Sequence, residues 1–500
     1  MGAARVHRLR PADLANLWAE GPGSPSQIAL VAEFAAGPLT TPGGRPDLPR
    51  IRAELARRAA AVPALTRRVR WTRPGEGLPV WVADPAPDPA GRIGTASLPE
   101  GADLVGWCAD RVVVPLDRDG PLWRAEIVDG LPGDRFGLLV VLHHVLADGL
   151  AGVALAARLL DGAPGEDGGG VAKPDAPAGG RRPATAAGGA GGPAVEGGTG
   201  GVAEPAVEGG TGGVAEPAVA DSTEPTRRAL VADAWRTRLH SARAALARLP
   251  QLPAGLRRAV RSLAGTAGEL RHPAPRTSLP RHLGPHRRLA AVRVPLSEVR
   301  AAGHAAGATV NDIVLSAVAA GLRAHFTARG ERVDGLTLPV SMPVARGGGR
   351  PGGMVLVGLP VGEPDPRRRL AAIVTATSAA KRRLRDGDGD LFDVLRLPVP
   401  VARAAVRWLR GRAARYVTLV VTDVPGPPQP LWLAGARMLD AVGVAPLSAD
   451  IALGVAVLSY AGTLAVTVNA DAAIGSLDAF VGGIAAELGH LGGPGAAPHR

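Results

Sequence analysis

Apolar residues recur along this chain with two different spacings, and the alternation between them predicts a mixed α/β protein. Residues 136–142 (FGLLVVL) form a short, continuous apolar run, which predicts a strand buried on both faces. The apolar positions that follow recur at helical spacing and predict a helix over 149–160. They are Leu150, Val153, Ala154, Ala157 and Leu160. This segment is therefore expected to be a strand, a tight turn and a helix that packs back on the sheet.

The second half of the chain shows the same alternation. Its patterns predict helices over 311–330 and 367–385, strands over 336–342, 354–361 and 416–422, and a hairpin-like pair at 451–458 and 463–469. Two α/β lobes are implied. A cleft between two lobes is where a substrate tunnel is expected to lie.

The two halves are separated by a segment of very different composition. Residues 162–226 consist mainly of Gly, Ala, Pro and Glu and contain the repeat PAVEGGTGGVAE at 193–204 and again at 205–216. Such a segment cannot bury a core and is expected to be a disordered linker. The predicted domains are a first lobe (1–161), this linker (162–226), a basic helical connector (227–275), a second lobe (276–490) and a tail (491–500).

The net charge of +12 is concentrated in the connector and the start of the second lobe. Residues 227–300 contain 16 arginines and no lysine against three acidic residues. Basic amphipathic helices over residues 227–270 suit an anionic membrane or lipid-droplet surface, and a solvated connector is the alternative. Nucleic acid is not expected as a partner, because aromatic residues make up only 3% of the chain and no recognition motif is present.

The compartment is constrained by what the sequence lacks. Cys108 is the only cysteine, so no intrachain disulfide can form, and it is interpreted as a plain buried thiol. Residues 1–10 do not have the apolar core of a secretory signal, and no apolar run reaches the length of a membrane span. We expect a cytoplasmic protein, soluble or peripheral on the inner face of the membrane or on lipid droplets.

The residues with the clearest chemistry are at the end of the strand over 136–142, where the chain reads HHxxxDG from His143 to Gly149. Because side chains alternate faces along a strand, His143 and His144 are expected to have different roles. His144 is our candidate for a general base acting on a hydroxyl or thiol. Asp148 is expected to fix a tautomer or to pair with an arginine and hold the turn, while Gly149 allows close backbone approach.

Three other interpretations of the histidine pair compete with a catalytic role. The pair can be structural, or it can be the remnant of an enzyme that has lost activity. A metal site requires convergent ligands, whereas neighbouring strand positions diverge and no third ligand lies at suitable spacing. No metal is therefore expected.

Several motifs occur in a fixed order and together resemble one family. They are PLDRDGPLW at 115–123, HHxxxDG at 143–149, TVNDIVL at 309–315, DVPGP at 423–427 and LSYAG at 458–462. In this order they resemble the bacterial wax ester synthase/diacylglycerol acyltransferase family. HHxxxDG by itself indicates only the wider superfamily of CoA-dependent acyltransferases.

The resemblance implies an α/β fold of two chloramphenicol-acetyltransferase-like lobes around a tunnel, joined here by the disordered linker and basic helices. Acyl-CoA enters as co-substrate from one side, with no further cofactor, and a fatty alcohol or diacylglycerol enters from the other. The resemblance makes His144 the base, with His143 and Asp148 beside it in the catalytic group and Gly149 as a supporting residue. It places Pro121, Leu122 and Trp123 in the acyl-binding region and gives Asn311 and Asp312 a supporting role from the second lobe.

Some positions depart from the family pattern. Ser341-Met342-Pro343 and Gly352-Gly353 stand where the family commonly has a VPVSxR strand end followed by a Gly-Asn pair, and Asp423 replaces an asparagine. Two alternatives to wax ester or triacylglycerol synthesis therefore remain. One is a condensation-type acyltransferase that uses a carrier-bound thioester or a natural-product hydroxyl. The other is a catalytically weak lipid-binding protein.

Overall fold

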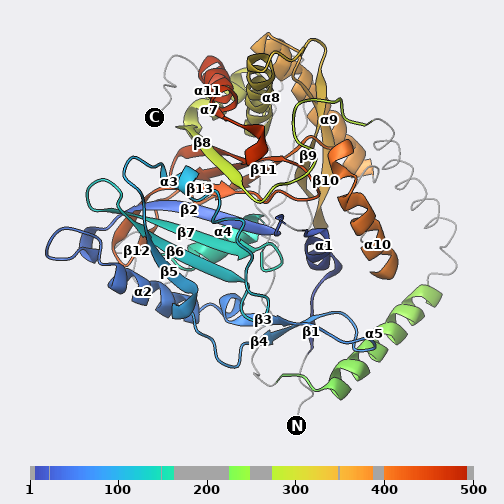
Figure 1. Ribbon diagram of the computed structural model, residues 1–500. Helices are drawn as coiled ribbons and strands as arrows, with labels where there is room; N and C mark the ends of the chain where they lie inside the picture. The colour runs from blue at the N-terminus through green and yellow to red at the C-terminus, as the bar shows by residue number, and fades with distance from the viewer. Residues whose placement is uncertain are drawn as a thin grey trace, which may run out of the picture.

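The computed structural model contains two six-stranded mixed sheets, stacked as an upper and a lower lobe in Figure 1. It describes residues 6–21, 23–147, 149–162, 224–247, 273–346, 350–386 and 399–492. Four predicted regions lie outside the described residues. They are the repeat-containing part of the linker, residues 248–272 of the connector, Asp148 and nearly all of the tail.

The first lobe is built on the sheet that carries the histidine pair. Its strands, in spatial order, are β12 (Trp432–Leu433), β13 (Ala436–Val444), β2 (Gln27–Ala35), β7 (Arg135–His143), β6 (Trp123–Asp129) and β5 (Ile93–Ser97). Only β5 and β6 pair in parallel. All residues of β7 except the first are buried, as the continuous apolar run predicted.

Helices cover this sheet on both sides. They are α1 (Pro11–Ala19), α2 (Leu48–Ala60), α3 (Leu104–Trp107) and α4 (Gly149–Ala157), with 3₁₀ turns at Gly37–Leu39, Pro63–Leu65 and Ala90–Arg92. On one face of the sheet, Phe34 and Phe136 stack with ring centroids 5.0 Å apart beneath Ile51 and Leu55 of α2. The predicted helix over 149–160 is α4, so the histidine pair lies at a strand-to-helix turn, as predicted.

The second lobe has its own sheet and a layer of helices. Its strands, in spatial order, are β10 (Arg350–Pro360), β9 (Thr337–Arg346), β11 (Leu419–Pro425), β14 (Leu453–Tyr460), β15 (Thr463–Asp471) and β8 (Arg287–Pro295). The helices are α7 (Leu296–Ala305), α8 (Val310–Ala328), α9 (Pro366–Asp386), α10 (Val399–Arg410) and α11 (Asp478–Gly492), with 3₁₀ turns at Ala413–Arg415 and Ala472–Ile474. Each strand and helix predicted for this half is present, with its ends shifted by a few residues.

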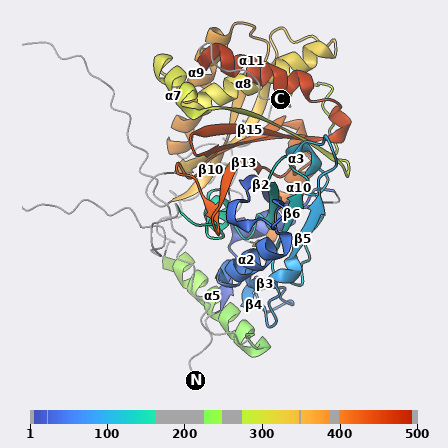
Figure 2. The same cartoon turned by 90° about the vertical axis from the view of Figure 1, so that its left-hand side faces the viewer.

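The basic connector forms one helix in the part of the chain that the structure describes. This helix, α5 (Arg227–Ala247), packs on a small sheet of β1 (His7–Arg8), β4 (Val80–Ala83) and β3 (Arg67–Arg70). Leu230 is fully buried against Val80 and Val82 of that sheet. Figure 2 shows α5 at the lower edge of the molecule, beside β3 and β4.

The two lobes interlock instead of meeting along a simple boundary. The predicted division at residue 276 assigns β12 and β13 to the second lobe, whereas both strands hydrogen-bond within the first lobe's sheet. Strand β13 pairs with β2, and its Val442 and Val444 share a core with Leu289 and Ala465 of the second lobe. Neither β12 nor β13 is among the strands predicted from the sequence, so both the strands and the sheet that they join are findings of the structure.

Within the described segments, no single helix is both long and apolar enough to cross a bilayer. The pair α7 and α8 meets the length and composition test only together, across a bend of 98°. Most of α8 is buried in the core of the second lobe, which accounts for its apolar composition.

Candidate active site

His143 is the last residue of β7, and its backbone N–H and both ring nitrogens form hydrogen bonds. Its side chain is 3% exposed, and its backbone N–H donates to the carbonyl of Leu122 at 3.0 Å. The backbone N–H of Val145 donates to Nδ1 at 3.1 Å, so Nδ1 is the unprotonated nitrogen. Nε2 therefore carries the hydrogen and donates it to Oε1 of Glu20 at 2.9 Å. With both ring nitrogens bonded inside the protein, His143 is suited to positioning and not to proton transfer with a substrate.

Glu20 is the partner that sequence reasoning missed. Its carboxylate accepts from His143 and from the backbone N–H of Ser26 at 2.9 Å, and it forms an ion pair with Arg118. Its backbone carbonyl accepts from the guanidinium of Arg410 on α10. Burial acts to raise the pKa of Glu20, but the hydrogen bond and charge of His143, together with Ser26 and Arg118, outweigh it and lower the pKa.

His144 is the first residue of the turn, and its environment differs from that of His143. Its backbone N–H donates to the carbonyl of Ser26 at 2.7 Å, and its side chain is half-buried. Its Nδ1 lies 3.0 Å from Nδ2 of Asn16 on α1. The two histidines contact different residues and differ in exposure, and the predicted difference in their roles stays a prediction. Gly149 begins α4, and Asp148 between them is outside the described residues.

Pro121, Leu122 and Trp123 lie directly beside the histidine strand. Trp123 begins β6 opposite Leu142, and Leu122 and Trp123 are 2% and 1% exposed. The indole Nε1 of Trp123 donates to the carbonyl of Leu65 at 2.8 Å, while the carbonyl of Leu122 accepts from His143. These residues thus support the turn from within the core, and a contact with the acyl chain stays a prediction.

Asn311 and Asp312 form a corner of the second lobe. Asp312 is 3% exposed and closes a capping box at the start of α8, accepting from the backbone N–H of Thr309 at 2.9 Å and from its hydroxyl at 2.7 Å. Its other oxygen accepts from Thr377 of α9 at 2.7 Å. Asn311 donates from Nδ2 toward the sulfur of Met342 at 3.0 Å. The recorded hydrogen bonds of both residues stay within the second lobe, so their influence on the histidine turn remains a prediction.

Asp423, which stands where the resembled pattern has an asparagine, brings a carboxyl to β11. It is near the end of β11, beyond the point where β9 stops pairing with that strand, and its side chain reaches solvent. Enough protein surrounds the carboxyl that desolvation raises its pKa to about 6. Strand β11 packs beside α4, the helix that follows the histidine turn, so Asp423 brings a carboxyl from the second lobe into this neighbourhood.

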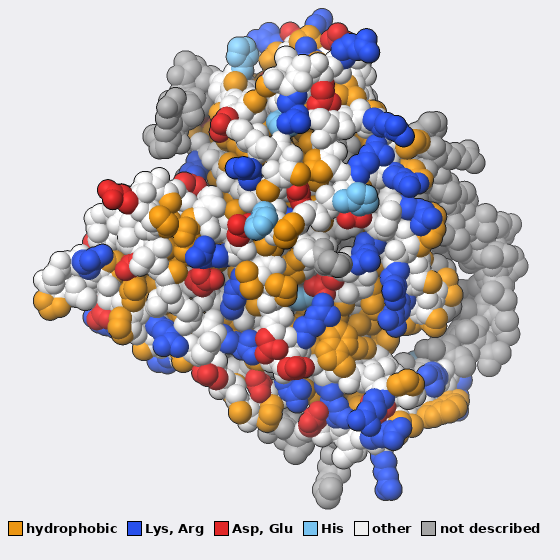
Figure 3. Space-filling view, in the orientation of Figure 1, with side chains coloured by type: hydrophobic (Ala, Val, Ile, Leu, Met, Phe, Trp, Pro, Cys, Tyr) orange, Lys and Arg blue, Asp and Glu red, His pale blue; other side chains and the backbone are white. Residues whose placement is uncertain are grey.

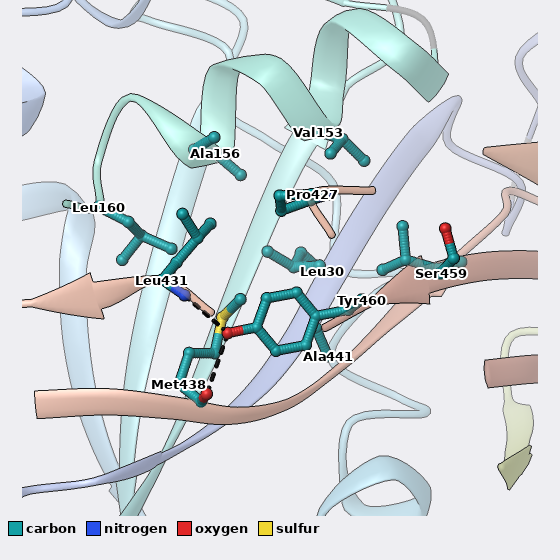
Figure 4. Close-up of a pocket in the computed structure, with 12 residues that line it drawn as sticks. Leu30, Val153, Ala156, Leu160, Pro427, Leu431, Met438, Ala441, Ser459 and Tyr460 are labelled. Carbon is teal, nitrogen blue, oxygen red and sulfur yellow. Dashed lines mark hydrogen bonds between the residues drawn. The ribbon is translucent and has the colours of Figure 1, made fainter. Parts of the chain in front are cut away.

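A narrow apolar pocket adjoins the same helix (Figure 4). Val153, Ala156 and Leu160 face Leu431, Met438 and Tyr460 across it. The hydroxyl of Tyr460 accepts from the backbone N–H of Leu431 at 2.9 Å and donates to the carbonyl of Met438 at 3.0 Å. Because these bonds satisfy the tyrosine hydroxyl, the pocket presents an almost wholly hydrocarbon lining.

No group of three or more His, Cys, Asp or Glu side chains that could hold a metal ion occurs among the residues described. Cys108 is buried, and burial raises the pKa of its thiol to about 12. The interpretation of Cys108 as a plain buried thiol is confirmed as far as its burial.

Family models match most of the chain. The model of the wax ester synthase/diacylglycerol acyltransferase catalytic domain matches residues 9–314, and the model of the WS/DGAT C-terminal domain matches residues 351–491. A probable diacylglycerol O-acyltransferase of Mycobacterium tuberculosis is 27% identical over 441 residues, covering 86% of this chain and 84% of the relative. A putative diacylglycerol O-acyltransferase of the same species is 36% identical over 365 residues, covering 70% of this chain and 69% of that protein.

Solved structures show the same fold. The wax ester synthase/diacylglycerol acyltransferase of Marinobacter aquaeolei VT8 superposes with a TM-score of 0.64 at 22% identity, covering 97% of this chain and 98% of that one. The first condensation domain of the calcium-dependent antibiotic synthetase superposes with a TM-score of 0.54 at 16% identity, covering 99% and 98%. The predicted architecture of two α/β lobes like those of chloramphenicol acetyltransferase is thereby confirmed.

Proposed function

Since the chain belongs to the wax ester synthase/diacylglycerol acyltransferase family, we propose that His144 is the general base by which it transfers an acyl group to a hydroxyl. The reaction class is that of the family, acyl-CoA-dependent O-acyl transfer in wax ester or triacylglycerol synthesis. The acceptor we propose is a fatty alcohol or a diacylglycerol.

The observation that carries this proposal is the difference between the two histidines. His143 is buried with Nε2 on Glu20 and Nδ1 on the backbone of Val145. His144 is half-buried, and its backbone is fixed by Ser26 at 2.7 Å. A general base has to be held in place and still be reachable by the acceptor hydroxyl, and of the pair His144 has that combination.

The proposed chemistry has two steps. His144 takes the proton of the acceptor hydroxyl as its oxygen attacks the thioester carbonyl, forming a tetrahedral intermediate with a negatively charged oxygen. The intermediate then collapses by breaking the carbon–sulfur bond. The CoA thiolate leaves and receives the proton from the His144 imidazolium, which gives the ester, free CoA and a neutral histidine.

The apolar pocket beside α4 suits a hydrocarbon chain of one of the two substrates. It lies between α4, which follows the histidine turn, and the strands β13 and β14. A methylene chain placed there gains about 0.8 kcal/mol for each CH₂ removed from water. We propose that this pocket receives part of an aliphatic chain whose reacting end lies at the turn.

The direct test is an acceptor screen with the purified protein, following release of the CoA thiol and identifying products by mass spectrometry. Palmitoyl-CoA is supplied with hexadecanol or diolein. We expect ester formation with at least one acceptor and a loss on the order of 100- to 10,000-fold in His144→Ala. The exposed His304 of α7 provides a matched control, and His304→Ala is expected to retain the wild-type rate.

The screen also separates the alternatives. Turnover only with a carrier-bound thioester favours the condensation-type reaction, and lipid binding without turnover on any acceptor favours the catalytically weak protein. If His144→Ala releases thiol as fast as wild type, the assignment of His144 as base is wrong.

We further propose that the protein works on the cytoplasmic face of an anionic membrane or on a lipid droplet, contacting it through the connector. Helix α5 buries Leu230 and pairs Asp233 with Arg8 at 2.8 Å, and this leaves its other side outward. Trp235 and Leu239 are 57% and 53% exposed there. Arginines surround them, and Figure 3 shows Lys and Arg side chains gathered with apolar ones on this side of the molecule. Interfacial helices combine these two residue classes.

Sedimentation with vesicles of phosphatidylcholine and phosphatidylglycerol tests this contact. Replacing Arg236, Arg238 and Arg243 by Gln is expected to lower vesicle binding by about 100-fold, since each surface arginine contributes about 1 kcal/mol. A control replaces three arginines exposed elsewhere, Arg45, Arg300 and Arg332, and is expected to bind within about threefold of wild type. Equal loss in both variants would show a general charge effect and would refute a docking role for α5.

A further inference from the structure

We infer that Asn16 is a positioning residue that selects the tautomer of His144 through its side-chain amide. The inference rests on the proposed role of His144 as base and adds a residue to that site. It starts from one contact, the 3.0 Å separation between Nδ2 of Asn16 and Nδ1 of His144. The two residues are 128 positions apart in sequence, so the fold has to bring α1 to the histidine turn for this contact to exist.

Helix α1 is well fixed on both sides of Asn16. At its start, the Asp13 carboxylate accepts from the backbone N–H of Arg10 at 3.0 Å, and Leu14 is 2% exposed in the first-lobe core. At its end, the carboxylate of Glu20 accepts a hydrogen bond from His143 and pairs with Arg118. The backbone carbonyl of Glu20 accepts from Arg410. Asn16 therefore presents its amide from a rigid support, which is what orientation of a catalytic imidazole requires.

The required tautomer follows from the reaction. For Nε2 to take a proton, neutral His144 has to carry its hydrogen on Nδ1, and after the transfer both nitrogens carry hydrogen. An asparagine amide can bond to Nδ1 whether or not that nitrogen carries a hydrogen. A half-turn about its terminal torsion exchanges the Nδ2 donor for the Oδ1 acceptor. With Nδ2–H toward Nδ1 the ring is held in the Nε2–H form; with Oδ1 toward Nδ1–H it becomes a base at Nε2.

The Asn16 amide that faces His144 carries no charge, whereas a carboxylate in its place would. An aspartate at this place would also accept from Nδ1–H, but its charge would stabilise the imidazolium and keep the ring protonated to higher pH. Of the charged side chains at this end of α1, Glu20 engages His143 and Arg118 through its carboxylate, and Arg410 donates to its backbone carbonyl. Asn16 thus orients His144 without adding a charge, which leaves the proton free to pass to the departing thiolate.

Two substitutions of Asn16 separate orientation from simple packing. Asn16→Leu keeps a side chain of similar length but removes both amide groups, while Asn16→Asp keeps the acceptor and adds a charge. Ala15→Ser, at the preceding position of α1, controls for general effects on the helix. The readouts are the pH dependence of kcat and KM with palmitoyl-CoA, and carbethoxylation of His144 by diethyl pyrocarbonate, followed by peptide mass spectrometry.

We expect Asn16→Leu to lower kcat by about 10- to 100-fold with KM changed by less than about threefold, since substrate contacts remain while the base loses its orientation. In Asn16→Asp, the midpoint of the carbethoxylation profile of His144 is expected to move to higher pH by about 1. The acid limb of the kcat profile should move with it. Ala15→Ser should match wild type in every measurement.

The inference is overturned if both variants leave the carbethoxylation midpoint and kcat as in wild type. It is also overturned if KM alone rises, because that result would indicate a substrate contact. The carbethoxylation readout needs no turnover: if no acceptor is esterified, the proposed function fails, yet a moved midpoint in Asn16→Asp still establishes the pairing with His144. Should Asn16→Leu fail to fold, the nearly isosteric Asn16→Asp decides the matter alone.

Discussion

The histidine turn of the first lobe and the corner at Thr309–Asp312 of the second lobe are both short polar motifs beside a helix start, yet the structure uses them differently. The contacts of Asp312 are a capping box and a link from α8 to α9 inside one lobe. His143 and His144 also have close neighbours in sequence, but three of their partners, Glu20, Asn16 and Ser26, come from more than a hundred residues earlier in the chain. The Thr309–Asp312 corner orders a core, and the histidine turn assembles a site.

The largest predicted effect is a loss of stability when Asp312 in the second-lobe corner is replaced. Asp312→Ala removes a buried carboxylate that accepts three hydrogen bonds and leaves Thr309 and Thr377 without their partner. We expect the free energy of unfolding to fall by about 3 kcal/mol. Urea unfolding measures this loss, and kcat per folded molecule should stay within about threefold of wild type. Asp334→Ala, at an exposed position, is the control.

The stability role assigned to the second-lobe corner would be contradicted if Asp312→Ala keeps its stability but loses turnover. In that case the second-lobe motif would act on the reaction itself, as its resemblance to the family motif first suggested.

A smaller effect on stability is expected at the histidine turn. Glu20→Gln keeps the shape of the side chain but removes the charge that faces His143 and Arg118. We expect a loss of about 1 to 2 kcal/mol at pH 7 and about a 10-fold lower kcat, because the turn that carries His144 loses its support. Glu100→Gln at an exposed site is the control.

The pH dependence of this stability loss has a definite sign. The pKa of Glu20 is lowered in the folded state, so its carboxylate stabilises the protein above the ordinary value of 4.5. That contribution disappears as the pH falls through the folded pKa. The stability difference between wild type and Glu20→Gln should therefore shrink on acidification below pH 4.5. A difference that stays constant with pH would contradict the role assigned to the charge.

The smallest effect concerns Asp423, which brings a second-lobe carboxyl close to α4. Desolvation raises the pKa of Asp423 from 3.8 to about 6, so its ionisation opposes folding increasingly as the pH rises from 3.8 to about 6, and fully above that. Asp423→Asn should melt at a slightly higher temperature than wild type at pH 8, and the two should melt alike at pH 3, where Asp423 is neutral in both the folded and the unfolded chain. Asp88→Asn, at an exposed position, should show neither effect. A lower melting temperature for Asp423→Asn at pH 8 would show that the charge has a stabilising partner.

Local patterns in the sequence predicted much of the fold but only part of the site. The run 136–142 and the helical spacing after it led to β7, the turn and α4, because periodicity is a local signal. The membership of β13 in the first-lobe sheet depends on pairing with β2, some 400 residues away, and no local pattern encodes that pairing.

The same limit applies to the residues around the histidines. Glu20 and Asn16 stand in an ordinary amphipathic stretch, and only the folded chain brings them to His143 and His144. The signal that could have found Glu20 is chemical: a buried histidine at a strand end needs a partner, and a carboxylate at the end of the neighbouring helix is able to supply it.

The central claim is that His143 holds the turn in position and that His144 acts as the general base. Its most direct test compares His143→Gln and His144→Gln by thermal melting and by single-turnover release of CoA thiol. We predict that His144→Gln melts within a few degrees of wild type and loses the chemical step by at least about 100-fold. His143→Gln should melt clearly lower, since it disturbs Glu20 and Val145, and should keep more of its rate per folded molecule. Full turnover in His144→Gln, or a greater loss in a well-folded His143→Gln, would contradict the account.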